Sequence, residues 1–238
     1  MRPNSTGFRS PALLTAALAM AAATSAQAAA PVFFGPTAYL SAADVPAGFY
    51  AGGVATLLET LEDRSLDASL AASRGLLLDV GFAGARDAVD ADDGVIDGTC
   101  GPQTAGRCVS WFDGAGSFGL TFTYQGAGPL PTAFGLVWTD GGGTITFSAV
   151  GADGQSLGSI SATGIADNSF GATTGEDRFF GVQFDGGIRS IRIANSSGGI
   201  EVDHIQYGTA AAVPEPGSWA LMLGGGLLLA RRLARRGR

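Results

Sequence analysis

Glycine-rich clusters that separate short alternating segments constrain this chain more than any other feature. Glycine supplies 38 of the 238 residues, and the clusters DGGG at 140–143, DGG at 185–187 and SSGG at 196–199 stand between apolar runs. Within these runs, apolar side chains alternate with threonine and serine. A period of two is the pattern of a half-buried strand, and Gly/Asp/Ser clusters are typical turns. The sequence therefore predicts an all-β domain.

Seven segments carry this pattern and are expected to be strands: 117–125, 134–139, 144–150, 156–162, 179–184, 188–194 and 200–207. In the first of them, Phe118, Leu120, Phe122 and Tyr124 should share one face. The third and fourth flank an Asp-Gly turn at 153–154 and predict a hairpin. Short strands of this kind favour an antiparallel β-sandwich, with a jelly roll as the specific expectation.

The stretch 57–73 gives no clear signal. Its leucines, Leu57, Leu61, Leu66 and Leu70, roughly fit one face of an amphipathic helix. Its polar residues fit a loop equally well. The sequence leaves both readings open.

The N-terminal residues 1–28 have the organisation of a secretory signal peptide. Arg2 and Arg9 form a charged start, an apolar Ala/Leu-rich stretch follows at 11–23, and Ala26 and Ala28 bracket an Ala-x-Ala site. Small residues at those positions fit the signal peptidase groove, so cleavage is expected after Ala28 and the protein is expected to be exported. The folded ectodomain then covers residues 29–212.

The C-terminal tail, residues 213–238, combines three features in a fixed order. A proline motif comes first, an uncharged apolar segment follows at 217–230, and an arginine cluster ends the chain. Prolines keep the motif extended, the apolar segment predicts a transmembrane helix, and arginines resist translocation. The segment is shorter than the roughly 20 residues that a straight spanning helix needs, although long arginine side chains can snorkel to the interface. The motif consists of Val213, Pro214, Glu215 and Pro216, and the cluster of Arg231, Arg232, Arg235, Arg236 and Arg238.

This order of Pro-Glu-Pro, Trp-Ala-Leu-Met-Leu and an arginine cluster resembles the PEP-CTERM sorting signal, also described as the ice-binding-protein C-terminal domain. The resemblance implies that an exosortase, a membrane enzyme of exopolysaccharide-producing Gram-negative bacteria, recognises residues 213–216 and cuts near them. It also implies transient anchoring in the inner membrane, then release to the cell surface or the exopolysaccharide matrix. Segments 89–98, 135–140, 176–181 and 199–204 are similar to a recurring group of PEP-CTERM ectodomains that brings no established activity.

The net charge of the ectodomain limits the kinds of partner that it is expected to bind. Residues 29–212 hold 20 acidic residues, 7 arginines and no lysine, a net charge of −13, while the other seven arginines lie in the two ends. Such a surface repels phosphate backbones and excludes nucleic acid as a partner. It favours divalent cations instead.

An acidic loop is the one stretch of sequence with the chemistry of a ligand site. Asp90, Asp92, Asp93 and Asp97 could converge oxygen ligands on calcium. Compared with an EF-hand, the third Asp comes one position early and no closing Glu follows, so distant residues such as Glu201 or Asp203 would have to complete the site. A solvated acidic turn is the alternative.

The two cysteines, Cys100 and Cys108, lie in a Gly/Pro-containing segment. In an exported protein, such a pair predicts a disulfide. A metal site would need more soft ligands than the sequence supplies.

Catalytic machinery is not expected. His204 is the only histidine, and the segment 115–119 (AGSFG) misses the G-x-S-x-G pattern at its first glycine. A hydrolase would require His204 in a cleft beside a serine or a carboxylate. Of the aromatic residues that could stack on a sugar, Trp138 should be buried and Trp111 has the better prospect of exposure. The leading interpretation is a noncatalytic exported protein of the cell surface or exopolysaccharide matrix, and the alternative is a calcium-stabilised carbohydrate-binding module.

Overall fold

The computed structural model describes residues 29–50, 55–79, 88–89, 109–166 and 176–209, together with Gly225 and Arg232. The signal peptide, the sorting motif, the acidic loop from Asp90 to Asp97 and both cysteines lie outside these residues. Within the described part, no helix is long and apolar enough to cross a membrane.

Strands dominate this part of the chain, and every pair of strands is antiparallel, which confirms the all-β prediction. The strands are β1 (Val32–Ala38), β2 (Ala55–Glu59), β3 (Leu70–Ala72), β4 (Leu76–Asp79), β5 (Val109–Asp113), β6 (Leu120–Tyr124), β7 (Ala133–Gly151), β8 (Ser156–Ala162), β9 (Arg178–Gln183) and β10 (Ile188–Thr209). Two short 3-10 helices, η1 (Ala42–Asp44) and η3 (Gly116–Phe118), interrupt them.

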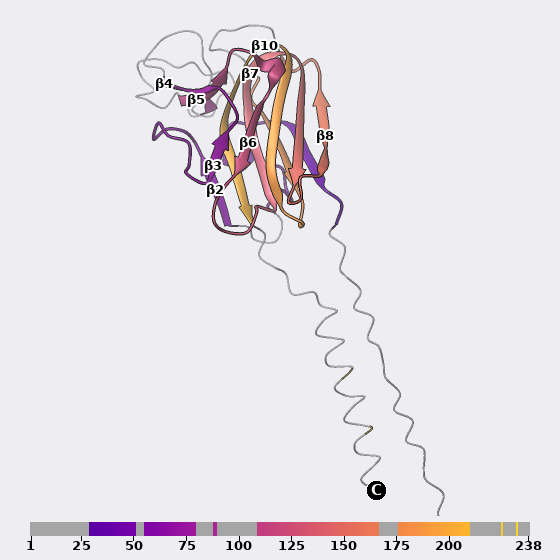
Figure 1. The fold of residues 1–238 in the computed structure, drawn as a ribbon. Helices are drawn as coiled ribbons and strands as arrows, with labels where there is room; N and C mark the ends of the chain where they lie inside the picture. The colour runs from indigo at the N-terminus through magenta and orange to yellow at the C-terminus, as the bar shows by residue number, and fades with distance from the viewer. Residues whose placement is uncertain are drawn as a thin grey trace, which may run out of the picture.

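The two longest strands, β7 and β10, form a ribbon that is folded double (Figure 1). The ribbon bends where the glycines at 141–143 meet residues 195–200, and the register shifts there. Its two ends come back together, because the Ile188 amide donates to the Pro131 carbonyl (2.7 Å) and the Thr132 amide donates to the Gly208 carbonyl (2.8 Å). Each half of the ribbon therefore belongs to a different layer.

The remaining strands extend the two layers. One half of the ribbon pairs with β9, β2 and β5, and through them with β1 and β4, while the other half pairs with β8 and β6, and through β6 with β3. Between the layers, the Phe147 ring of β7 stacks 6.0 Å from that of Phe180 on β9 and meets Phe33 of β1 edge-on at 6.2 Å. The result is a sandwich-like arrangement of one bent sheet, and jelly-roll connectivity remains a prediction.

One layer is buried on both of its faces. Towards the other layer it presents Phe134, Leu136 and Trp138, all fully buried. On its outer face, a second apolar cluster forms around Val137 and Phe179, covered mainly by Tyr39 and Phe49 from the segment after β1. Central strands with two covered faces read as near-continuous buried runs, which explains why residues 133–142 lack the alternation of a half-buried strand.

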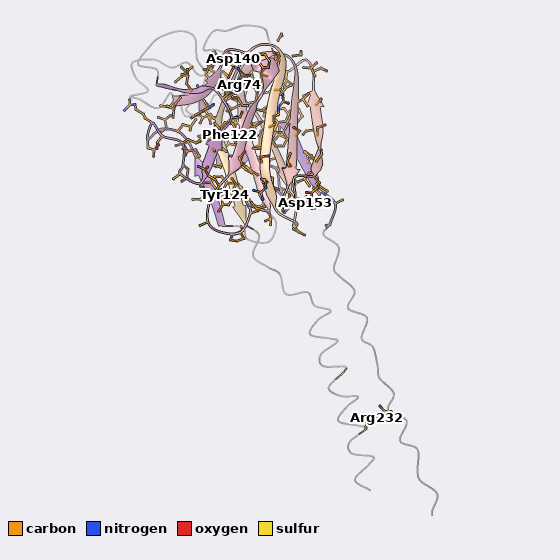
Figure 2. All side chains as sticks on the ribbon, viewed as in Figure 1. Arg74, Phe122, Tyr124, Asp140, Asp153 and Arg232 are labelled. Atoms are coloured by element: carbon orange, nitrogen blue, oxygen red, sulfur yellow. The ribbon has the colours of Figure 1, made fainter. Side chains whose placement is uncertain are left out.

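The two ends of the domain are formed by different parts of the strands (Figure 2). At the end we call proximal, Val32 pairs with Gln183, Gln183 with Ala133, and Ala133 with Gly208, so the start of β1 and the end of β10 lie in one row of the sheet. At the opposite, distal end lie the bend of the ribbon and Asp140, which pairs with Glu201. Chain segments that precede and follow the domain therefore leave it from the same end.

Several expected elements differ from those observed. The predicted turn at 140–143 is wrong, because β7 runs through it, and the predicted strands 188–194 and 200–207 are one strand, β10. Ladder hydrogen bonds between two equally glycine-rich segments hold both strands through the bend. The ambiguous stretch 57–73 contains no helix and supplies strand residues to β2 and β3. The hairpin of 144–150 with 156–162 is confirmed as β7–β8.

The start of the predicted strand 117–125 is also wrong. Residues 116–118 form η3, and β6 begins only at Leu120. Phe118, expected to share a face with Leu120 and Phe122, is 67% exposed, whereas those two are fully buried. The positive φ of Gly119 (68°) separates the two elements and turns Phe118 away from the core.

Candidate functional site

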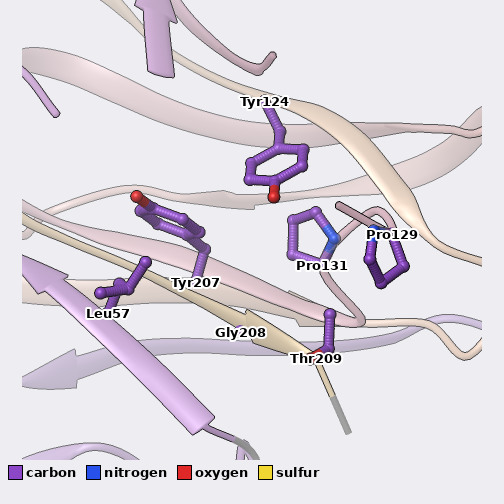
Figure 3. Close-up of a pocket in the computed structure, with 7 residues that line it drawn as sticks. All are labelled: Leu57, Tyr124, Pro129, Pro131, Tyr207, Gly208 and Thr209. Carbon is purple, nitrogen blue, oxygen red and sulfur yellow. The ribbon is translucent and has the colours of Figure 1, made fainter. Parts of the chain in front are cut away.

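A hollow of about 270 Å³ opens at the proximal end, between β2, β6 and the end of β10 (Figure 3). Its size is near the lower end of the roughly 300–1,000 Å³ typical of small-ligand sites. We call it the tyrosine hollow. It is lined by Leu57, Tyr124, Pro129, Pro131, Tyr207, Gly208 and Thr209.

Sheet pairing brings the lining together. Leu57 of β2 lies opposite Tyr207 of β10, and the Tyr207 and Tyr124 rings are 5.9 Å apart at an angle of 60°. On its other side, the Tyr207 ring packs 5.6 Å from Phe134 in the core. Tyr207 is 2% exposed and Leu57 is 56% exposed, so the hollow joins a rigid aromatic floor to an open apolar rim.

Hydrogen bonds fix the floor. The Tyr207 hydroxyl donates to Asp67 Oδ1 (3.0 Å) and lies 2.7 Å from Ser69 Oγ. The Asp67 carboxylate also accepts the Ser69 amide (2.7 Å) and hydroxyl (2.6 Å), and these bonds hold the pKa of Asp67 below its usual value. Burial, with a smaller effect from the nearby carboxylates, raises the pKa of Tyr207 to about 12. The floor therefore stays neutral at Tyr207 and negative at Asp67 over the physiological range.

The Tyr124 hydroxyl is a free polar group of the hollow among the described residues. Figure 3 shows it directed toward the ring of Pro131, and it has no hydrogen-bond partner among the described residues. A hydroxyl in this position can donate to or accept from a bound molecule.

A second hollow, of about 410 Å³, adjoins the first and shares Pro129 and Thr209 with it. The segment between them is held rigidly, because Thr132 both donates to Gly208 and accepts the Phe184 amide (2.8 Å). This second hollow is more polar, since it is lined by the exposed Asp185 and the backbone of Gly186 and Gly187. Together the two hollows offer apolar faces on one side of the 129–132 segment and a carboxylate on the other.

His204 lies away from both hollows. It is 4% exposed, sits on the outer face of its layer, and its Nδ1 is 3.0 Å from the Tyr39 hydroxyl. The Gln206 amide also donates to that hydroxyl (2.8 Å). Ser117, the serine of the AGSFG segment, is exposed in η3 at the distal end. His204 is therefore buried against Tyr39, whereas Ser117 lies on the surface.

Side-chain carboxylates hold the residues on either side of the undescribed segment 90–108, which contains the predicted calcium loop. Asp203, fully buried, accepts the Val89 amide (3.0 Å), and Glu62 accepts the Val109 amide (3.0 Å). Glu201 accepts the Ser110 hydroxyl (3.1 Å). Asp203 therefore lies next to the residue that precedes the acidic loop, and Glu201 lies next to Ser110, which follows the segment 90–108. Asp90, Asp92, Asp93 and Asp97 themselves lie outside the described residues, and the described residues alone contain no group of three acidic, histidine or cysteine side chains that could hold a metal ion.

The sequence did not single out the tyrosine hollow. Tyr124 and Tyr207 were each expected within a strand, and both lie in strands, but no local pattern joins them. The one sequence feature that could have indicated the hollow is the pair of prolines that follows Tyr124 in the loop 125–132. Trp138 is buried as expected, and Trp111 is half-buried with its indole N–H bonded to the Arg74 carbonyl (2.9 Å).

No protein-family model and no curated protein matches the sequence. Among solved structures, the catalytic domain of a GH87 alpha-1,3-glucanase in complex with nigerose is similar to 68% of this chain at 18% identity and a TM-score of 0.36, and this chain spans 30% of that chain's length. The C-terminal family 22 carbohydrate-binding module of Clostridium thermocellum Xyn10B is similar to 68% of this chain at 12% identity and a TM-score of 0.29, over 98% of its own length. Likenesses at this level carry no argument about the site, so function rests on the geometry above.

Proposed function

We propose that this chain is an exported, noncatalytic protein of the cell surface or exopolysaccharide matrix, and that its β domain binds a saccharide in the tyrosine hollow. The single observation that carries the binding activity is the hollow itself. It combines two tyrosine rings, two proline rings and the free Tyr124 hydroxyl in a space near ligand size. Sugar rings have apolar C–H faces and polar edges, so they suit a site with rigid rings and a few polar groups.

Export and sorting are supported by the two ends of the chain. The signal peptide of residues 1–28 and the tail of residues 213–238 keep the features described above, and both chain ends leave the domain at its proximal end. A domain attached at that end presents its distal end outward. The exosortase would act on Val213, Pro214, Glu215 and Pro216, and the arginine cluster would hold the tail in the inner membrane until cleavage.

Saccharide binding is tested with the full chain purified in detergent, on an array of neutral and acidic bacterial glycans. Tyr124→Ala and Leu57→Ala should each weaken binding to the best glycan at least tenfold. Leu58→Ala is the matched control, because Leu58 is 40% exposed on the same strand but does not line the hollow. Absence of binding across the array, or equal losses from Leu57→Ala and Leu58→Ala, would rule out the hollow as the binding site.

Sorting is tested separately in the native host. Deletion of its exosortase should keep the chain in the inner membrane, and mass spectrometry of released protein from the parent strain should find a C-terminus near residue 216. Released protein that still carries residues 219–238 would show that the proposed processing is wrong.

A further inference from the structure

A second exposed aromatic site lies at the distal end, around the end of η3. Phe118 is 67% exposed, the most exposed of the large hydrophobic side chains of the described residues. Two guanidinium groups contact it: Arg74 lies with its Cζ 4.6 Å from the ring centroid, and Arg192 Nη2 donates to the Phe118 carbonyl (3.0 Å). We call Phe118, Arg74 and Arg192 the Phe118 patch.

The local backbone holds this patch in place. The Gly119 amide closes η3 by donating to the Gly116 carbonyl (2.9 Å), and the Arg192 guanidinium packs over Gly119. A Cβ at position 119 would stand 2.7 Å from Arg192 Nη2 and Cζ, so only glycine allows this close approach. The backbone of Arg192 is held in β10, opposite Thr121 of β6, and its guanidinium is placed by the bond to the Phe118 carbonyl.

The patch is positive in a domain that is otherwise acidic. Arg74 Nε is paired with Asp113 Oδ2 at 2.6 Å, and Asp113 is 8% exposed, so this carboxylate neutralises one of the two cations. Arg192 has no ion-pair partner among the described residues. One uncompensated guanidinium beside an exposed ring contrasts with the net charge of −13 over residues 29–212.

We propose that the Phe118 patch binds a carboxylate-bearing sugar of an acidic polysaccharide. The apolar face of the sugar would pack on Phe118, and its carboxylate would accept from the Arg192 guanidinium, whose planar fork suits carboxylates. A sugar with one carboxylate beside an apolar ring face matches the single free cation beside a single ring.

This inference rests on the proposed function only in taking the ligand to be a saccharide. The two sites lie at opposite ends of β6, since η3 precedes it and Tyr124 ends it, about 14 Å apart along the strand at its usual rise. Substitutions at one site should therefore leave the other intact.

The test uses the full chain in detergent with polygalacturonate, its fully methyl-esterified form, and poly-glutamate as probes in isothermal titration calorimetry. The wild-type protein should bind polygalacturonate, bind the ester at least tenfold more weakly, and bind poly-glutamate weakly. Phe118→Ala and Arg192→Gln should each weaken polygalacturonate binding at least tenfold. The polygalacturonate affinity of Arg192→Lys should lie between that of these two variants and that of the wild type, because lysine keeps the charge but lacks the planar guanidinium.

Arg189→Gln is the matched control, since Arg189 is exposed on the same strand and contacts only the Ala152 carbonyl among the described residues. Equal binding of acid and ester, equal binding of poly-glutamate, or unchanged binding by Phe118→Ala would each overturn the proposal. Tyr124→Ala separates the two sites. If this variant loses neutral-glycan binding and retains polygalacturonate binding, both the tyrosine hollow and the Phe118 patch are supported. If it loses neutral-glycan binding and the wild-type protein never binds polygalacturonate, only the Phe118 patch is overturned.

Discussion

The side-chain amide of Asn195 stabilises the bend of the β7–β10 ribbon through hydrogen bonds. It is 3% exposed, accepts the Trp138 indole N–H (3.2 Å) and donates to the carbonyls of Ser197 (3.3 Å) and Gly199. The Trp138 ring is fully buried, so its N–H has no access to water. One amide thus connects the core to both sides of the bend.

Asn195→Ala should lower the free energy of unfolding by about 1–3 kcal/mol, because it leaves a buried indole N–H unsatisfied. Urea unfolding measures this change. Ser197→Ala, on an exposed side chain of the same bend, should alter stability by less than about 0.5 kcal/mol. Equal effects of the two substitutions would show that the bend does not depend on the Asn195–Trp138 bond.

The Tyr207 hydroxyl, in the floor of the tyrosine hollow, makes the free energy of unfolding depend on pH above pH 10. Its pKa is raised to about 12 from 10, chiefly by burial, so the folded state binds the hydroxyl proton more tightly than the unfolded state does. The stabilising contribution is therefore complete below pH 10 and is lost as the pH rises from 10 towards 12. Burial also raises the pKa of Tyr50, whose hydroxyl donates to Gln206.

Tyr207→Phe should flatten the fall in unfolding midpoint between pH 10 and 12, since Phe carries no titrating hydroxyl. Thermal melts across this range, with tyrosinate absorbance recorded in parallel, provide the measurement. Tyr50 keeps a residual slope in the variant. An identical alkaline slope in Tyr207→Phe and wild type would contradict the assigned cause.

At the scale of elements, the β7–β10 ribbon is the framework of the domain. It joins both layers, and residues 133–142 and 200–208 are buried throughout. By contrast, within the part of the chain that the structure describes, β3 pairs only with β6, and β4 only with β5. Local opening should therefore begin at these short strands.

Amide hydrogen exchange should accordingly be slowest in 133–140 and 200–207 and faster in β3 and β4, by at least a hundredfold after correction for intrinsic rates. Mass spectrometry of peptic fragments resolves these segments. The β7–β8 hairpin, paired on one side of β8 only, should fall between them. Equal protection of β4 and of the ribbon would contradict this order.

At the scale of the whole molecule, the segment 90–108, which contains the acidic loop, follows Val89 and precedes Val109, and the amides of these two residues donate to side-chain carboxylates. A cation bound at Asp90, Asp92, Asp93 and Asp97 would lock this loop onto the bent sheet. The calcium site stays a prediction, and it has a thermodynamic consequence. A ligand at 100 times its Kd stabilises the folded state by about 2.7 kcal/mol.

Chelation should therefore lower the melting temperature of the full chain by about 5–10 °C, and added calcium should restore it. Asp92→Asn with Asp93→Asn should abolish the difference, whereas Asp185→Asn, an exposed carboxylate at the proximal end, should preserve it. A melting temperature that is the same with and without chelator would remove calcium from the loop.

The sequence determined what depends on local pattern. Alternation at 144–150 and 156–162 specified a hairpin, because side chains one residue apart point to opposite faces whatever the rest of the chain does. The apolar and charged ends and the acidic, lysine-free domain between them are likewise local properties, and the predictions of export and of no nucleic-acid partner rest on them.

The tertiary structure alone decided the rest, since it depends on which distant segments pair. Glycines at 141–143 have the composition of a turn, and only their pairing with β10 makes them the bend of one strand. Tyr124 and Tyr207 form a hollow because the two layers bring the end of β6, in one layer, against the end of β10, in the other, beside β2 and the 129–132 segment. Phe118, predicted to share a face with Leu120 and Phe122, became an exposed site because Gly119 adopts a positive φ beneath Arg192. Local pattern fixes the faces of a strand, but contacts between residues far apart in the chain decide which face meets solvent, core or ligand.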